Sequence, residues 1–277
     1  MVVVHLKNVD FNKKIKNKKM STLTCIETYI DKDQNHYGCF VIEPLEIGQG
    51  ITLGNTLRRT LLSDLNGYGI TGVRINNLKH EFSVIEGMRE DILEVILNLK
   101  EITFKSAFST RSNKTNRLKG FLNVKGPKIV TAGLFELPSN LLKIVNPSQY
   151  ICTLVDNSEF YLEIDIENGK GYRLTEENRR QQIERQISSV KPATLFIDTV
   201  FMPIKKVNYK IKLIHDTKGN IKESLIVEIL TNGSITPKRS LNEALKILMN
   251  LFYSLFITPS FLSISNQLRN EIKNNDN

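Results

Sequence analysis

The chain has 277 residues, of which 40% are hydrophobic, enough for one large domain or two modest ones with a core each. No apolar run approaches the ~18 residues that a membrane-spanning helix needs, so we expect no membrane contact. The net charge of +9 suits a nucleic-acid partner and an acidic protein partner equally. Three scattered cysteines without a C-x-x-C pair exclude a disulfide framework and a zinc ribbon and indicate a reducing compartment; they are Cys25, Cys39 and Cys152.

The first 20 residues carry six lysines and one aspartate. Their charge follows the short apolar run "MVVV", which is the reverse of the order in a secretory signal. The sequence therefore predicts a flexible basic arm over 1–20. Lysine, asparagine and isoleucine are abundant along the whole chain, a bias typical of proteins encoded by AT-rich organellar genomes.

The first half of the chain mixes strand and helix signals. Alternating polarity predicts strands over 23–30, 37–45 and 70–78, and a helix over 53–65 lies between the last two. A second helix is predicted by apolar residues that recur with helical spacing. That stripe consists of Met88, Ile92, Val95, Ile96 and Leu99.

The second half begins with a polar stretch, 103–118, that carries no clear signal. Strands are predicted over 120–132 and 150–169, the latter as a hairpin that turns near Asp156 and Asn157. The charged stretch 169–192 indicates a long surface loop or a frayed helix. Two further strands flank the turn "TKGN", and a capping box, Ser240-x-x-Glu243, begins a final helix. This irregular order of strands and helices predicts an α+β fold.

The glycines at 48, 50 and 54 suggest a phosphate-binding loop, but their spacing does not fit one. A dinucleotide fingerprint needs its third glycine one residue earlier, and a P-loop needs Gly-Lys before Ser or Thr where this chain has Gly54-Asn55-Thr56. His80-Glu81 lacks the second histidine of a zincin. We therefore expect no catalytic residue, no metal site and no cofactor in this chain.

The two helices at the ends of the chain have more informative geometry. Four leucines at 53, 57, 61 and 65 lie along one side of the first helix, Arg59 points roughly opposite, and Arg58 borders the leucines. Such arginines are either simply solvated or offer a guanidinium fork to a partner. The final helix is apolar over about 200° of its circumference, whereas a surface helix needs somewhat more than 100°. The excess requires a large core or a second chain.

Several blocks of the sequence resemble the alpha subunit of bacterial-type, plastid-encoded RNA polymerase. They include "EPLEIGQGITLGNTLRRTLLSDLNG", "HEFSVIEGMREDILEVILNLK", "VTAGLFELPSN" and "ILTNGSITPKRSLNEALKIL", in family order from about residue 22 to 257. The resemblance implies the family's two-subdomain amino-terminal fold. A discontinuous dimerisation subdomain would comprise 21–68 plus 202–258, and an inserted, mostly-β subdomain would span 69–201.

The resemblance also implies a homodimer, formed by helices 53–65 and 240–257, on which the large β and β′ catalytic subunits assemble. The expected dimer-interface residues are Leu53, Leu57, Leu61, Leu245, Leu248, Phe252 and Leu255. Arg59 corresponds to a family arginine that binds β, with Arg58 beside it. The segment from His80 to Asp91 and residues 199–205 would also face the large subunits, and the expected contacts are His80, Glu81, Glu86 and Asp91.

Three further expectations complete the sequence-based hypothesis. The activity, DNA-directed RNA synthesis, would belong to the complex, located in the plastid stroma or in a bacterial cytoplasm. About 20 residues follow the last helix, so we expect a disordered tail over 259–277 in place of the family's separate carboxy-terminal DNA-binding domain, and DNA contact only through the complex. The alternative is a stand-alone nucleic-acid-binding module that uses the basic arm with Arg58 and Arg59.

Overall fold

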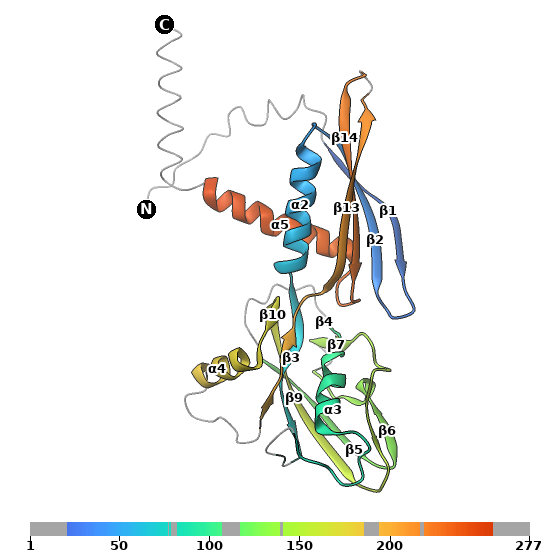
Figure 1. The fold of residues 1–277 in the computed structure, drawn as a ribbon, viewed down its shortest axis with the longest axis vertical. Helices are drawn as coiled ribbons and strands as arrows, with labels where there is room; N and C mark the ends of the chain where they lie inside the picture. The colour runs from blue at the N-terminus through green and yellow to red at the C-terminus, as the bar shows by residue number, and fades with distance from the viewer. Residues whose placement is uncertain are drawn as a thin grey trace.

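The computed structural model describes residues 21–76, 78, 82–106, 117–138, 141–185, 194–216 and 219–256 (Figure 1). These residues form an α+β fold rich in strands, as the irregular order of signals predicted. The strands are β1 (Thr22–Ile30), β2 (His36–Leu45), β3 (Asn66–Ile75), β4 (Phe104–Ser106), β5 (Leu118–Lys125), β6 (Lys128–Thr131), β7 (Leu142–Ile144), β8 (Tyr150–Leu154), β9 (Glu159–Lys170), β10 (Tyr172–Arg173), β11 (Leu195–Phe196), β12 (Thr199–Val200), β13 (Ile204–His215) and β14 (Ile221–Thr231). The helices are α2 (Gln49–Ser63), α3 (Ile92–Lys100), α4 (Thr175–Arg185) and α5 (Pro237–Phe256), with a 3-10 turn at Ala132–Leu134.

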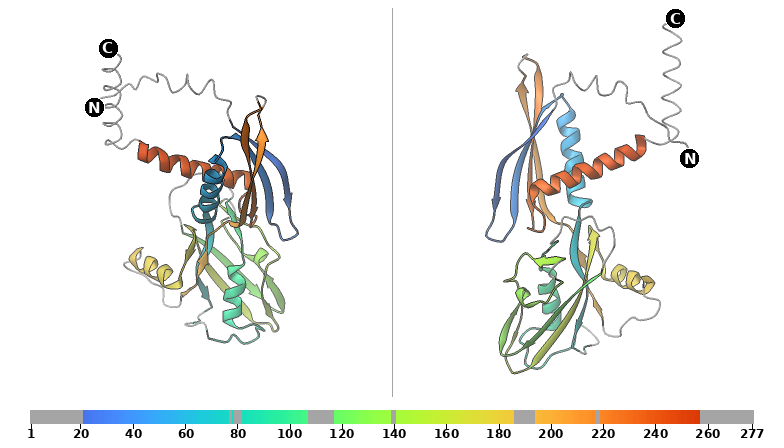
Figure 2. Two further views of the ribbon diagram at one scale, coloured as in Figure 1. Left: turned by 45° about the horizontal axis from the view of Figure 1, so that its top comes forward. Right: turned by 180° about the vertical axis from the view of Figure 1, so that it is seen from behind.

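One four-stranded antiparallel sheet joins segments from both ends of the chain in the order β1-β2-β14-β13. Helices α2 and α5 cross the same face of this sheet (Figure 1, Figure 2). Alternate residues of the strands point toward the helices, because side chains in a strand alternate between its two faces. Together they bury the first hydrophobic core, whose members include Phe40, Ile42, Leu57, Leu61, Leu225, Val227, Ile229 and Leu241.

A second core lies in the part of the chain between α2 and β13. Its main sheet has the order β11-β3-β9-β5 and packs with α3, and shorter pairs (β4-β7 and β6-β8) complete the enclosure. The members include Val73, Val95, Leu99, Leu122, Phe160, Leu162 and Ile164. The two cores share no residue, although one chain builds both.

The chain passes between the two cores twice at nearly the same point. A Cβ atom on Gly67 would lie 1.9 Å from the carbonyl oxygen of Phe201, so the outgoing strand β3 and the returning segment before β13 are in direct backbone contact. Phe201 is buried there, and the guanidinium of Arg173 lies 4.8 Å from the centre of its ring. Gly67 is required at this crossing because no side chain fits.

Of the three glycines before the Arg58-Arg59 pair, one forms a turn and two allow α2 to pack closely on the sheet. Only Gly48, at φ +86°, forms the turn into the helix, which begins at residue 49 and not at 53. Gly50 and Gly54 lie inside α2, where a Cβ on Gly54 would be 2.6 Å from the ring of Tyr209 on β13. Glycine therefore lets α2 approach the sheet closely. Glu223 of β14 accepts hydrogen bonds from the backbone N–H groups of Gly48 (2.9 Å) and Gly50 (2.8 Å), which satisfies the start of the helix.

Two further expected helix starts are wrong. The helix expected from Met88 begins at Ile92, because Met88 pairs with Leu154 as an isolated β-bridge. The final helix begins at Pro237 and not at a capping box on Ser240, whose hydroxyl donates to the carbonyl of Pro237 at 2.8 Å. Glu243 instead accepts a bond from Arg239. A proline suits the first position of a helix because its missing N–H would have no partner there.

In the middle of the chain one expectation is wrong, and one open choice between a loop and a helix is decided. The hairpin expected at Asp156 and Asn157 is wrong, since β8 pairs with β6 whereas β9 pairs with β3 and β5. The charged stretch after 169 contains α4, a helix with a polar surface. One polar side chain anchors it, because the amide of Asn178 donates to the carbonyl of Ile197 at 2.7 Å and to the hydroxyl of Thr199 at 3.0 Å. Apolar periodicity could not predict a helix held in that way.

Candidate functional site

The arginine pair on α2 divides into two different environments. Arg58 donates through Nη1 to the carbonyl oxygen of Val207 on β13 at 2.6 Å, so its guanidinium is used within the chain. Arg59 is exposed, and its side chain has no hydrogen-bond or ion-pair partner among the residues that the structure describes. Both arginines are exposed, and the docking role of each stays a prediction; Arg59 is the stronger candidate, because one N–H of Arg58 is already donated to Val207.

The seven leucine and phenylalanine positions expected at a dimer interface also differ from one another. Leu57 and Leu61 are completely buried, and Leu248 nearly so, all within the first core of a single chain. These three side chains already pack inside one chain, and their contact with a second chain stays a prediction. Leu53 and Leu245 are half-buried beside that core, and Phe252 and Leu255 are exposed.

The carboxy-terminal half of α5 presents an uncovered apolar surface. Every residue from 249 to 256 is exposed, and this end of the helix extends beyond α2 and away from the sheet (Figure 1, Figure 2). Six large apolar side chains lie on it: Met249, Leu251, Phe252, Tyr253, Leu255 and Phe256. A cluster of this kind marks a contact surface, because exposed apolar residues are normal when scattered singly but not when they are contiguous.

The segment before α3 forms a second exposed region. Glu86 and Asp91 are exposed, and Asp91 precedes α3 without capping it through its side chain. More than three quarters of the surface of Phe82 and of Val84 is exposed to solvent, although both side chains are apolar. His80 and Glu81, expected here as contacts, lie outside the described residues.

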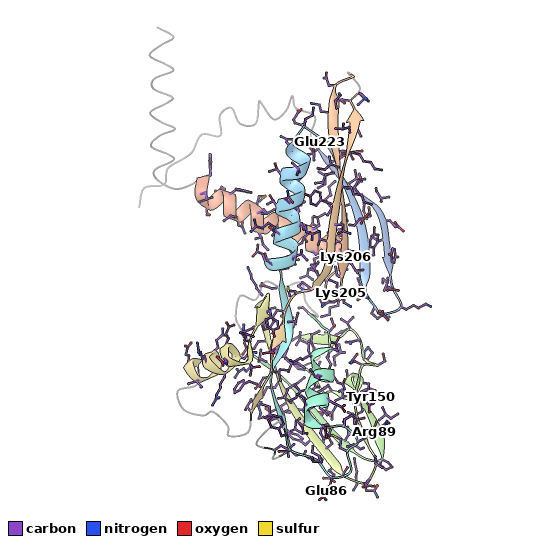
Figure 3. The ribbon with its side chains drawn as sticks, in the orientation of Figure 1. Glu86, Arg89, Tyr150, Lys205, Lys206 and Glu223 are labelled. Carbon is purple, nitrogen blue, oxygen red and sulfur yellow. The ribbon has the colours of Figure 1, made fainter. Side chains whose placement is uncertain are left out.

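Next to this segment, a groove of about 690 Å³ lies between α3 and the pair β6-β8. Leu97, Ile129 and Tyr150 give it an apolar wall, and Arg89 adds an exposed cation at the end of the molecule where Figure 3 shows Glu86, Arg89 and Tyr150. The carboxylate of Glu90 fixes the floor by accepting from the N–H of Thr153 (2.7 Å) and from the hydroxyl of Tyr150. Burial, together with this bond, raises the pKa of Tyr150, so the phenol stays protonated as a donor.

A ladder of charges on β9, which the sequence-based reading missed, stabilises the second sheet. Glu163, Asp165 and Glu167 are buried on one face of this strand. Arg74 holds Asp165 with two bonds of 2.8 and 3.0 Å and also bonds Glu163, while Lys119 lies 2.7 Å from Glu163. Arg117 and Arg173 bond the two oxygens of Glu167. The alternation "EIDIE" was the available signal, since acidic residues at every second position of a strand share a face.

Among the described residues, no group of three histidine, cysteine or acidic side chains is arranged to hold a metal ion. None of the helices in the described part of the chain is long and apolar enough to cross a membrane. Burial raises the pKa of Cys152 to about 12, so this thiol is a core residue and not a nucleophile.

Comparison with known proteins identifies the same family as the sequence blocks. Residues 73–202 match the family model for the RNA polymerase Rpb3/RpoA insert domain. The DNA-directed RNA polymerase subunit alpha of Pyropia yezoensis is 48% identical over 233 residues, which cover 84% of this chain and 70% of the relative. The subunits of Porphyra purpurea and of the cyanobacterium Trichormus variabilis are 46% and 40% identical with the same coverage. The chain therefore belongs to the family of DNA-directed RNA polymerase alpha subunits.

Proposed function

We propose that two copies of this chain form a scaffold on which the β and β′ subunits of a plastid RNA polymerase assemble. The observation that carries the proposal is the exposed apolar half of α5 on a member of the alpha-subunit family. Catalysis and DNA contact would belong to the assembled enzyme. The plastid stroma is the proposed location, because the relatives named above come from two algae and a cyanobacterium.

The proposed subdomains follow the two hydrophobic cores. The first core draws on residues from 40 to 65 and from 204 to 248, which supports a dimerisation subdomain over 21–68 plus 202–258. The second core uses residues from 70 to 197, which supports an inserted subdomain over 69–201. The close crossing of Gly67 and Phe201 is the connection expected between an insert and its host.

The proposed dimer contact is centred on Phe252 and Leu255, with the half-buried Leu53 and Leu245 at its margin. Leu57, Leu61 and Leu248 would support it from below by fixing the helices on the sheet. Two such surfaces related by a two-fold axis cover each other, since an isologous interface uses the same patch on both subunits. The proposed large-subunit contacts are Arg59 and the exposed segment that contains Glu86 and Asp91.

The dimer is tested by the mass of the purified chain in light scattering at several concentrations. We expect twice 31.7 kDa for the wild type and the monomer mass for Phe252→Asp, because an unpaired charge cannot be buried in an apolar interface. Circular dichroism should show that this variant is folded. Lys246→Asp, at an exposed position of the same helix, is the control and should remain a dimer. A folded Phe252→Asp dimer would refute the proposed interface.

Large-subunit docking is tested by pull-down of purified β with Arg59→Ala. We expect at least a tenfold loss of β binding with an unchanged melting temperature, because Arg59 has no partner to lose within the described chain. Arg58→Ala is the matched comparison on the same helix. It should bind β but lose about 1 kcal/mol of unfolding free energy with its bond to Val207. Wild-type β binding by Arg59→Ala would contradict the assignment.

The alternative of a stand-alone nucleic-acid-binding module is not favoured. It assigned both arginines to nucleic acid, but Arg58 is bonded to the backbone of β13. The other part of that hypothesis, the basic arm over 1–20, lies outside the described residues. The family membership of the chain also supports the assembly role directly.

A further inference from the structure

The two edges of the β1-β2-β14-β13 sheet are built differently. The β13 edge carries three exposed lysines on one face, Lys206, Lys210 and Lys212, and Arg58 occupies the carbonyl of Val207. Lysines on an edge strand discourage pairing with further strands, because a new strand would have to bury or oppose their charges. The β13 edge is therefore protected.

The β1 edge lacks lysine and proline, and its pairing with β2 is irregular only between Cys25 and Glu27. All nine residues of the strand, "TLTCIETYI", are exposed, and neither lysine nor proline occurs among them. Glu27 is its one charged side chain. Four large apolar side chains have more than two fifths of their surface exposed: Leu23, Ile26, Tyr29 and Ile30. A long apolar edge of this kind is the feature that natural sheets avoid unless a further strand covers it.

Neither helix of this sheet covers β1. Helix α5 begins above β2, where a Cβ on Gly38 would lie 2.6 Å from Cβ of Pro237, and it runs from there away from β1 (Figure 2). Leu23 and Ile30 of β1 point to the same face of the sheet as the helices. Neither α2 nor α5 covers them, so both side chains are exposed. This position leaves both the edge and the adjacent apolar surface accessible.

The charges around β1 define the complementary partner. The strand register places Glu27 beside Cys39, which in turn lies beside Glu228, so two carboxylates share one row on the face opposite the helices. Glu43 lies opposite Thr22 on the same face. On this face the β1 side carries the carboxylates of Glu27 and Glu43, whereas Glu228 of β14 lies 3.8 Å from Lys210, on the side that carries the lysines. A strand added next to β1 would place a side chain directly opposite Glu27, where a lysine or arginine is favourable and an acid is not.

We propose that β1 receives an extended, basic and apolar segment of a large polymerase subunit by strand addition, an inference that rests on the proposed function. Main-chain bonds along the free edge would supply affinity, and alternating side chains would supply specificity. Apolar residues of the segment would cover Leu23 and Ile30, and a basic one would pair with Glu27. A second copy of this chain is a poorer occupant, because its own β1 would bring another Glu27 to the same short ladder.

Hydrogen exchange read by mass spectrometry tests the proposal on the full chain, alone and after reconstitution with β and β′. We expect amides of Thr22–Ile30 to exchange at least tenfold more slowly in the assembly than in the free chain. Glu27→Lys should remove most of this protection. The control Lys212→Glu, at the opposite edge, should retain it.

The other outcomes each overturn the proposal in a recognisable way. An assembly with unprotected β1 refutes strand addition and leaves the scaffold function standing. Protection in the free chain that rises with concentration identifies a second copy as the occupant, and protection that disappears on deletion of residues 1–20 identifies the chain itself. If β and β′ do not bind at all, the proposed function fails, and this inference fails with it.

Discussion

At the scale of single residues, a few polar contacts fix helix α2 on the sheet and thereby set the direction in which its exposed residues point. Glu223 (Figure 3) satisfies the start of α2. Arg58 connects the middle of α2 to the edge of β13. Arg59 is thereby held on the outer side of a helix that is fixed at two points. The two neighbouring arginines therefore differ in their contacts. Successive residues of a helix point about 100° apart, so Arg58 reaches the backbone of β13 and Arg59 does not.

The charge ladder makes a prediction about pH. The guanidinium of Arg74 holds the pKa of Glu163 at about 2, against burial that raises it and with help from Lys119. Since this pKa lies below the ordinary 4.5, the pair stabilises the fold above pH 4.5 and loses that effect as the pH falls from 4.5 toward 2. Urea unfolding should therefore show a larger loss for Glu163→Gln at pH 7 than at pH 3.

A matched control lies on the same strand. Glu159 is exposed and only 3.9 Å from the similarly exposed Lys125, so Glu159→Gln should change the unfolding free energy by less than about 0.5 kcal/mol at either pH. A Glu163→Gln deficit that is equal at pH 7 and pH 3 would show that the ladder acts through shape and not through charge.

At the scale of elements, the contact of α2 with the sheet depends on a missing side chain. Gly54 lies against the ring of Tyr209, whose hydroxyl donates to Asn55 at 2.8 Å, so the helix is pressed onto β13 at this point. Leu57 and Leu61 can reach the core only because of this close approach. The glycine is therefore a packing residue, despite the low helix propensity that it contributes.

Gly54→Ala should destabilise the chain by about 1–3 kcal/mol, because the new methyl group would overlap the Tyr209 ring at 2.6 Å. In an exposed helix position the same change would stabilise. Thr52→Ala, at an exposed position two residues earlier, should stay within about 0.5 kcal/mol of the wild type. Thermal and urea unfolding measure both variants, and a more stable Gly54→Ala chain would show that α2 is not closely packed there.

At the scale of the whole molecule, two separate cores are joined by a crossing of two backbone segments. Leu65 belongs to the first core and Ile70 to the second, so the change of core takes only five residues on the outgoing side. On the return, Ile197 belongs to the second core and Ile204 to the first. Such an arrangement lets one part be removed without cutting through the other.

We therefore expect a shortened chain, with residue 68 joined to residue 202 by a short Gly-Ser linker, to fold and to dimerise. Because the two ends already meet at the crossing, the linker need not stretch. Circular dichroism and light scattering should show a cooperative unfolding transition and twice the mass of the shortened chain. An unfolded product would mean that the sheet formed by β1, β2, β14 and β13 depends on the second core, against the proposed subdomains.

The sequence by itself determined the strands of the two main sheets except β11, the presence of α2, α3 and α5, the α+β class and the family. Alternation with period two and stripes with period 3.6 are local properties, and long blocks in family order are specific. Only the tertiary structure decided that Leu57 is core whereas Phe252 is exposed, and that Arg58 is bonded whereas Arg59 has no side-chain partner among the described residues. A hydrophobic arc shows which side of a helix is apolar, but it does not show how far a neighbouring element covers that side. The strand partners of β8 and β9 and the anchor of α4 likewise depend on contacts distant in sequence, which no local pattern contains.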